Sequence, residues 1–465
     1  SNSNPFIPDL PAAGGSAPSS AQPEELEGSE LLDIPPEVHS LFDILRGEAI
    51  KRLDEFDPIH LFSLCWAYST ARLLDEGLHQ QITDAALRLG KKRDEEAARG
   101  FKARSPEPPS RSGEGAGADE PAALQQHEQP SVVAEGAHWM ALYKPPYWQV
   151  SVDSKEAARA ATITPFGDDD EGDADDEIFG EEHRRRPKMH LWIRQFLAQH
   201  YPICTDPLEA FGLLHRIDMQ TSGLLVCAKS YVGAYWLRLQ WCSYLVDKEY
   251  VCLVHGWVDP SVREVHKRIR VDKRKAKNSR RTVSTHCSVG ASGKPSYTEV
   301  CTLARFTRPP AEGAEAEDQR YSLVVLKLHT GRTHQIRVHM LSIGHPLVSD
   351  EKYAPERHAA DRVWCPRNFL HTYHLCFGEV PGHIDEGPEA RPAGAPGAGG
   401  EQPIRERGPL VDLKCPLPED LRGALAVLQP VDGASAQLHA DWMAGDVSRL
   451  RPFEEYGPEG GAGPE

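Results

Sequence analysis

Apolar residues near the N-terminal end recur with the period of an α-helix. Five of them fall on one helical face: Leu61, Leu64, Cys65, Tyr68 and Leu73. The Asp57-Pro58 pair before them suits an N-cap followed by proline at the first helical position. The segment from Leu78 to Leu89 repeats the same spacing. Residues 31–95 are therefore predicted to form a helical hairpin.

Beyond residue 137 the pattern changes to short apolar runs that are bounded by turn residues, which is typical of strands. The expected strands are Trp139–Tyr143, Gly223–Ala228, Glu249–Val258, Ser296–Leu303 and Tyr321–Leu328. Helices are expected at Met189–His200, Thr333–Ile343 and Leu421–Leu428. Because strands and helices do not alternate regularly, residues 137–430 are predicted to form an α+β domain. Its mixed, mainly antiparallel sheet would carry flanking helices.

Several polar stretches separate or extend these blocks. Residues 1–30 and 96–136 are rich in Pro, Gly and charged residues, and we expect a disordered segment and a disordered linker there. An acidic insertion near 160–186 and a Pro/Gly-rich insertion near 386–408 are expected within the α+β domain. Residues 431–465 are expected to be a tail.

The distribution of charge changes what the net charge implies. A formal net charge of -17 argues against a nucleic-acid partner, because phosphate binding depends on Lys and Arg. Residues 263–281, however, hold ten Lys and Arg residues against two acidic ones. The candidates for RNA contact in this basic run are Lys267, Arg268, Lys273 and Arg274. A solvated hairpin without a ligand is the alternative interpretation.

The ten cysteines show no CxxC spacing, which favours reduced thiols in the cytoplasm, nucleus, mitochondrion or plastid. Cys365, His371, His374 and Cys376 lie close together, but their spacing is unlike that of paired zinc ligands, so no metal is expected. No apolar run approaches the ~20 residues that span a bilayer. The chain begins at Ser1 without methionine, which leaves open a targeting peptide or further domains upstream.

The stretch from Leu213 to Val226 holds the first candidate for chemistry. Apolar residues flank a polar loop in which Thr221, Ser222 and Gly223 supply turn chemistry around Asp218. A carboxylate held there is either a reactive group or a brace that hydrogen-bonds its own backbone.

A second cluster, from Leu328 to His339, concentrates His, Arg and Gln where a strand meets a helix. Thr333 is the expected N-cap, and Arg332 precedes it at a place where a guanidinium can pair with a carboxylate. His334 and Arg337 lie in the first turn, and such a density of basic residues favours an anionic partner.

These segments resemble the RluA-type pseudouridine synthase family. HRIDMQTSGLLVCAKS is similar to the stretch around the family's catalytic aspartate, and LHTGRTHQIRVHMLSIGHPLVSDEKY to its second long motif. KEYVCLVHG resembles the tyrosine-bearing strand, YKPP the Lys-Pro strand, and NFLH the closing Leu-His strand. The five segments follow the family order over residues 139–380. LFSLCWAYSTARLL resembles organellar RNA-binding helical repeats, so residues 31–95 are either a remnant of one or an ordinary amphipathic hairpin.

The resemblance implies an enzyme that isomerises uridine to pseudouridine in ribosomal or transfer RNA. It implies that Asp218 is the nucleophile or base, that Tyr250 stacks on the uracil and helps remove the C5 proton, and that Arg332 orients Asp218. Arg216 would fill the gap left by the flipped base, and Thr221 would belong to the RNA-binding surface. The sequence departs from the common family pattern at Ile217, Met219 and Gln220. We expect these differences to affect which RNA substrate is preferred more than whether the protein is active.

Other functions fit the sequence less well. A catalytically idle RNA-binding scaffold would not need Asp218, Tyr250 and Arg332 together. A serine hydrolase would place Ser222 in a GxSxG turn, and a zinc deaminase would need HxE and PCxxC elements, which this sequence lacks around its candidate residues. We therefore expect an RNA-modifying isomerase that acts as a monomer and needs no cofactor and no metal.

Overall fold

A computed structural model describes residues 36–101, 128–150, 187–275, 282–309, 319–381 and 409–456. The sequence predictions for residues 1–30 and for the insertions near 160–186 and 386–408 lie outside the described residues.

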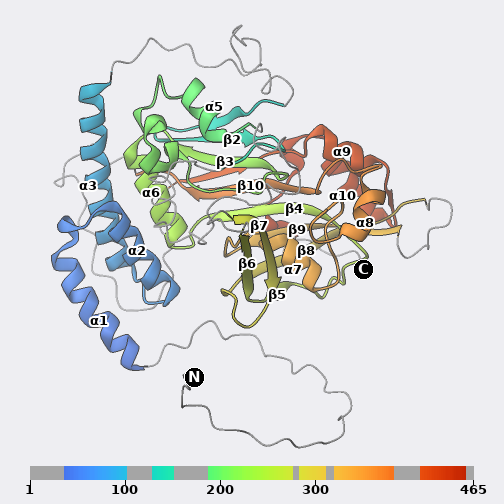
Figure 1. Cartoon of the computed structure of the whole chain (residues 1–465), viewed down its shortest axis with the longest axis horizontal. Coiled ribbons are helices and arrows are strands. Elements are labelled where there is room, and N and C mark those ends of the chain that lie inside the picture. Colours follow the sequence, from blue (N-terminus) through green and yellow to red (C-terminus); the bar gives the residue numbers. More distant parts are fainter. Residues whose placement is uncertain are drawn as a thin grey trace, which may run out of the picture. The chain divides into compact units, whose positions relative to one another are not determined.

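The described strands form one large sheet and a separate hairpin (Figure 1). The sheet order is β1-β2-β3-β10-β4-β9-β8-β12, with β11 paired to β10 and β5 to β8. Among the described strands, β3 and β10 run parallel and the other neighbours run antiparallel. Their bounds are β1 Ser131–Glu135, β2 Trp139–Lys144, β3 Ser222–Ala228, β4 Asp247–His255, β5 Glu264–His266, β8 Tyr297–Thr307, β9 Arg320–Leu328, β10 Leu370–Gly378, β11 Leu410–Lys414 and β12 Gln429–Pro430. The predicted α+β class is confirmed.

The two faces of the sheet bury two different cores, as the alternation of side chains along a strand requires. On β4, Tyr250 and Cys252 face the core that also contains the N-terminal helices. Val251 and Leu253 face the core formed with helices α9 (Glu419–Ala426), α10 (Gly433–Met443) and α11 (Phe453–Tyr456). The central strands are therefore covered on both faces, and the catalytic candidates on them are fixed by packing.

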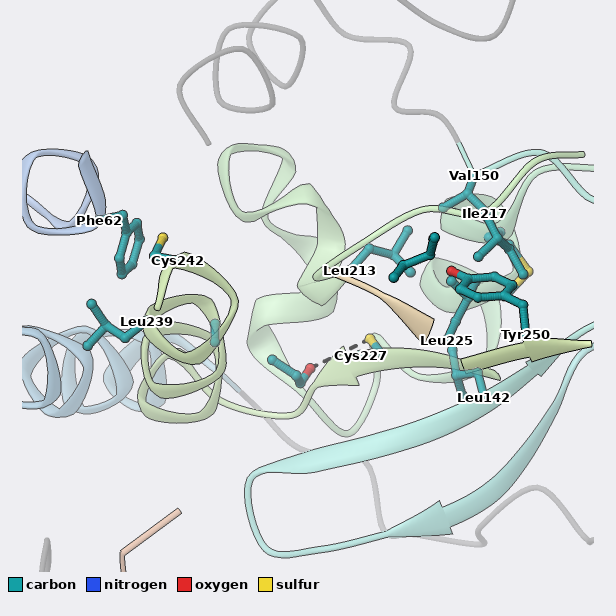
Figure 2. Close-up of a cluster of buried hydrophobic side chains, with 14 of the residues drawn as sticks. Phe62, Leu142, Val150, Leu213, Ile217, Leu225, Cys227, Leu239, Cys242 and Tyr250 are labelled. Carbon is teal, nitrogen blue, oxygen red and sulfur yellow. Dashed lines mark hydrogen bonds between the residues drawn. The ribbon is translucent and has the colours of Figure 1, made fainter. Parts of the chain in front are cut away.

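The N-terminal helices pack against the sheet domain through helix α6. Helices α2 (Pro58–Thr70) and α3 (Glu76–Gly100) follow α1 (Pro36–Lys51), and both α2 and α3 contact α6 (Tyr231–Cys242). The predicted N-cap is confirmed, because Asp57 Oδ1 accepts a hydrogen bond from His60 N at 3.0 Å. Phe62 meets the ring of Tyr235 with centroids 5.7 Å apart, and Figure 2 shows Phe62 beside Leu239 and Cys242 of α6.

The predicted linker of residues 96–136 is wrong at both ends. Helix α3 continues to Gly100 because its charged last turns still contact the protein: Asp94 accepts hydrogen bonds from Tyr231 N at 2.8 Å and Val232 N at 3.1 Å. At the other end, residues 131–135 form β1, an edge strand on β2. The end of α3 is polar in sequence, and β1 is a short edge strand whose side chains are all exposed or half-buried, so neither contrasts with its surroundings as a buried element does.

The predicted tail is also folded from its first residues to Tyr456. Helix α10 buries Trp442 against the second core, and Phe453 N donates to Glu249 Oε2 at 2.8 Å. Only Ser435 and Trp442 of α10 are buried, and its apolar residues do not follow a helical period, so the sequence does not reveal this helix.

Part of the basic run forms strand β6 (Ile269–Lys275), which pairs with β7 (Thr282–Val289) in a hairpin called here the basic hairpin. Residues 276–281 of the run lie outside the described residues. The basic hairpin packs on helix α7 (Gln335–Ser342), and a small apolar cluster joins Ile269 and Cys287 to Val338 and Tyr353. In the part of the chain that the structure describes, no helix is long and apolar enough to cross a membrane.

Candidate active site

Asp218 lies in the loop that leads into β3, and its side chain is 21% exposed. The loop closes through a backbone hydrogen bond from Thr221 N to Asp218 O at 3.1 Å. Gly223, at the start of β3, has φ +120°, and a Cβ atom there would collide with the backbone of Thr372 in β10. Glycine is therefore required where the loop enters the sheet.

One side of the Asp218 loop is held by Lys144, a fully buried residue at the end of β2. Its Nζ donates hydrogen bonds of 3.0 Å to the carbonyls of Pro145, Trp148 and Met219. Tyr147 N donates to the same Met219 carbonyl at 2.7 Å. A buried ammonium is tolerated only when its donors are used, so Lys144 pins the backbone directly after Asp218.

The other side is held by Arg367, which is also fully buried. It donates to Gln220 O at 2.9 Å and to Ser222 Oγ at 2.8 Å. Its remaining donors pair with Asp420 of α9 at 2.6 Å and 3.2 Å. Two buried cations thus hold the carbonyls of consecutive loop residues, and they leave the Asp218 carboxylate at the partly open side.

Arg337 is the residue whose ion pair with Asp218 defines the site. Its Nη1 lies 3.4 Å from Asp218 Oδ2, whereas Nε and Nη2 bind the two oxygens of Asp350 at 2.8 Å and 2.9 Å. Burial of Arg337 opposes its charge, but the Asp350 carboxylate raises its pKa above the ordinary value. Burial likewise opposes the charge of Asp350, and Arg337 lowers its pKa. The guanidinium therefore remains a permanent positive charge beside Asp218.

Tyr250 lies on β4 facing the same core as the Asp218 loop. Figure 2 shows its ring beside Ile217, Val150 and Leu225. Burial raises the pKa of Tyr250 to about 12, and the negative charge of Asp218 acts in the same direction. The structure thus brings Asp218, Tyr250 and Arg337 together, and the phenol keeps its proton at neutral pH.

The strand-to-helix junction differs from the prediction. Helix α7 begins at Gln335, not at a Thr333 cap, and the preceding His334 has φ +54° without a capping bond. The Gln335 side chain instead fixes the preceding turn, because its Oε1 accepts hydrogen bonds from Arg332 N at 3.0 Å and Thr330 Oγ1 at 2.8 Å. Arg332 Nε donates to Pro295 O at 3.3 Å. The predicted pairing of Arg332 with Asp218 stays a prediction.

The other RNA-binding candidates occupy different environments. Arg216 is exposed beside Asp218, whereas Thr221 is buried, and its Oγ1 has no hydrogen-bond partner among the described residues. Lys267 and Arg268 lie just before the basic hairpin, and they donate to Ser342 O at 2.9 Å and Gly293 O at 2.8 Å. Lys273 and Arg274 belong to β6, but their side chains lie outside the described residues.

His371, one of the histidines that could suggest a metal site, makes structural contacts within the sheet. His371 bonds to Ser222 Oγ at 2.9 Å and Cys415 O at 3.1 Å, and burial lowers its pKa to about 3. Within the described ranges, no group of three or more His, Cys, Asp or Glu residues could hold a metal ion.

Comparison with known proteins identifies the family of this chain. The family described as RNA pseudouridylate synthase matches residues 194–342, which include Asp218, Tyr250 and Arg337. The dual-specificity RNA pseudouridine synthase RluA of Vibrio parahaemolyticus is 32% identical over 216 residues, which are 45% of this chain and 79% of that protein. The chain belongs to the RluA-type pseudouridine synthase family.

Two further relatives carry names that specify an RNA. The ribosomal large subunit pseudouridine synthase D of Nitrosomonas europaea is 34% identical over 198 residues, 42% of this chain and 51% of the relative. The tRNA pseudouridine synthase C of Yersinia pestis is 34% identical over 165 residues, 35% of this chain and 61% of the relative. The chain thus spans only about half the length of several relatives that it matches.

Sequence reasoning missed the residues that support the site. Lys144 and Arg367 lie in or next to segments that resemble the family, but their partners are backbone carbonyls, which no residue pattern reveals. Arg337 was expected to contact RNA, and its pairing with Asp218 joins residues 119 positions apart.

Proposed function

We propose that this protein is an RNA pseudouridine synthase in which Asp218 is the catalytic carboxylate. The observation that carries the proposal is a partly exposed carboxylate paired with the buried Arg337 and adjoining the buried ring of Tyr250. If Asp218 only braced its loop, it would not need the buried Arg337, which Asp350 fixes in place, next to its Oδ2.

The proposed reaction breaks the bond between C1′ and N1 of uridine and forms a bond between C1′ and C5. Asp218 attacks C1′ or removes a proton from the sugar, as carboxylates do in glycoside chemistry. The uracil then rotates and rebonds to C1′ through C5, and a carboxylate that attacked C1′ is released as this bond forms. The C5 proton leaves to solvent and N1 gains a proton. Electrons and atoms balance within the substrate, so the reaction requires no cofactor.

Tyr250 is proposed to stack on the uracil. Because its pKa is raised to about 12, the resting phenol carries its proton and serves as an apolar ring and a hydrogen-bond donor. Removal of the C5 proton by Tyr250 therefore requires that the phenol first give up its own proton.

The substrate is proposed to be ribosomal or transfer RNA, in accordance with the names of the two relatives above. The target uridine must leave the helix to reach Asp218, and we expect the exposed Arg216, two residues before Asp218 in the chain, to fill the gap. The basic hairpin, with Lys267, Arg268, Lys273 and Arg274, would contact phosphates and fix the position of the RNA. Thr221 and His334 would line the bound nucleotide, Arg332 would help orient Asp218, and the protein would act as a monomer.

The test is tritium release from C5-labelled uridine in ribosomal and transfer RNA transcripts. Asp218→Asn is close to isosteric, so we expect it to bind RNA and to lose several orders of magnitude in rate, beyond the ~10² to ~10⁴ of a single acid-base assist. Asp259→Asn is the matched control, because Asp259 is an exposed turn residue that accepts a hydrogen bond from Ser261 N at 2.8 Å.

We expect the control to retain the parent rate. An Asp218→Asn protein that releases tritium at nearly the parent rate would refute the proposed role of Asp218. A folded parent protein that binds these RNAs and releases no tritium would favour the idle RNA-binding scaffold.

A further inference from the structure

Tyr353 is a buried residue that touches both the basic hairpin and the ion pair at the site. It follows helix α7 in the chain and is 6% exposed. Its apolar neighbours form a cluster separate from the two cores of the sheet, and the cluster contains residues of the hairpin and of α7. A side chain that served only to fill a core would have no need of the polar contacts described next.

On the hairpin side, the Tyr353 hydroxyl accepts a hydrogen bond from Cys287 N of β7 at 3.1 Å. The neighbouring Lys352 Nζ donates to Thr285 O of the same strand at 2.7 Å. The ring of His286 lies 5.3 Å from the ring of Tyr353. Two consecutive residues therefore hold three consecutive positions of β7, so a displacement of the hairpin by bound RNA must also act on Tyr353.

On the side of the site, the face of the Tyr353 ring lies 4.8 Å from the Arg337 guanidinium. Its backbone N–H donates to Asp350 Oδ1 at 3.1 Å, the same carboxylate that anchors Arg337. The hydroxyl is also 2.8 Å from His334 Nδ1 at the start of α7. The orientation of Arg337, and with it the position of its Nη1 against Asp218, thus depends on where Tyr353 lies.

We propose that Tyr353 is a positioning residue that couples RNA contact at the basic hairpin to the Asp218–Arg337 pair. This inference rests on the proposed function. RNA that holds the hairpin against α7 keeps the Tyr353 ring over Arg337, and the guanidinium then holds Asp218 in its reactive orientation. RNA that does not reach the hairpin leaves this orientation less populated, and it reacts more slowly.

Tyr353→Phe tests the coupling because it keeps the ring over Arg337 and removes the hydroxyl that binds Cys287 N and His334. Tyr68→Phe is the matched control: Tyr68 is 3% exposed and its hydroxyl donates to Phe42 O at 2.6 Å in the N-terminal helices. Single-turnover tritium release is measured on large-subunit ribosomal RNA transcripts and on short stem-loops cut around the uridine that the parent protein modifies. Dissociation constants are measured on the same RNAs.

We expect the parent and Tyr68→Phe to react faster with the long RNA than with the stem-loop. For Tyr353→Phe, the single-turnover rate on the long RNA should fall by about three- to tenfold, the effect of losing one or two hydrogen bonds, so that the difference between the two RNAs disappears. Its affinity for RNA should be nearly unchanged. The inference is overturned if Tyr353→Phe keeps the parent ratio of long to short RNA, or if the parent shows no such ratio. A parent protein without activity on these RNAs and on the transfer RNA transcripts of the earlier assay overturns the proposed function and this inference with it.

Discussion

The pairing of Asp218 with Arg337 is asymmetric in a way that suits a reactive carboxylate. Arg337 binds Asp350 with two hydrogen bonds of 2.8 Å and 2.9 Å, but it reaches Asp218 with one contact of 3.4 Å. Asp350 therefore fixes the guanidinium, and the guanidinium orients Asp218 without saturating its oxygens. A carboxylate held in this way keeps lone pairs for a substrate.

Arg337→Lys is predicted to impair chemistry more than RNA binding. A lysine ammonium is a point charge and cannot hold Asp350 through two donors while it reaches Asp218. We expect the single-turnover rate to fall by about 10² and the RNA dissociation constant to change by less than about threefold. Arg238→Lys is the control, since Arg238 is a comparably buried arginine that pairs with Glu209 in another part of the protein. If Arg337→Lys weakens RNA binding without slowing the reaction, Arg337 contacts RNA, as the sequence predicts, and does not orient Asp218.

At this scale the sequence named candidates for the reactive residues but not their supports. Asp218 stands out because a polar loop interrupts apolar runs, whereas Tyr250 was named through the resemblance of its strand to the family. Lys144 and Arg367 act on the carbonyls of Met219 and Gln220, and backbone carbonyls are the same in every sequence. The role of such a residue becomes visible only when the fold brings the two segments together.

At the scale of elements, the apolar pattern predicted the central strands to within a few residues. The strands β2, β3, β4 and β9 are bounded by turn residues and buried on both faces, so their sequences contrast sharply with their surroundings. Several elements with an exposed side were predicted only in part or not at all. Helix α3 continues past Gly90 with mostly charged residues. This part contacts α6 through the hydrogen bond from Tyr231 N to Asp94, and a polar contact of this kind leaves no trace in the spacing of apolar residues.

Asp94 should be the residue that fixes the end of α3 to α6. It accepts hydrogen bonds from the first two backbone N–H groups of α6, and Gly90 lies so close that an added Cβ would be 2.8 Å from Val232 Cα. Asp94→Ala is predicted to lower the free energy of unfolding by about 1 to 2 kcal/mol, the usual value of a helix cap. Urea denaturation measures it, with Glu96→Ala as an exposed control on the same helix. Equal effects of the two substitutions would contradict the capping role.

At the scale of the whole molecule, the C-terminal segment is clamped to the sheet by buried ionisable groups on the face opposite Tyr250. Glu249 is fully buried and bonds to Tyr373 Oη at 2.7 Å and to Phe453 N at 2.8 Å. His374 Nδ1 lies 2.8 Å from the same carboxylate, and its Nε2 lies 3.2 Å from Asp412. Lys327 pairs with Glu454 of α11. The segment expected to be a tail therefore completes the fold through polar contacts.

This clamp predicts that stability decreases above neutral pH. Burial opposes protonation of His374, but Glu249 and then Asp412 raise its pKa above the ordinary value of 6.5, with Lys414 acting in the opposite direction. A raised pKa in the folded state means that the charged histidine stabilises the protein fully below pH 6.5. This contribution disappears as the pH rises through the higher folded pKa. His374→Gln should lower the free energy of unfolding by about 2 kcal/mol at pH 6 and should flatten its dependence on pH above 6.5.

The measurement is urea denaturation at several pH values between 5.5 and 8.5, set about the 6.5 reference. His79→Gln provides a control of opposite sign: burial lowers the pKa of His79 to about 4, so only the unfolded state binds its proton in this range. His79 therefore lowers stability as the pH falls below 6.5 and contributes no slope above it, where the effect of His374 is measured. If the parent protein and His374→Gln lose stability in parallel as the pH rises, another group carries the pH dependence. The charged pair between His374 and Glu249 would then not be what holds the C-terminal segment on the sheet.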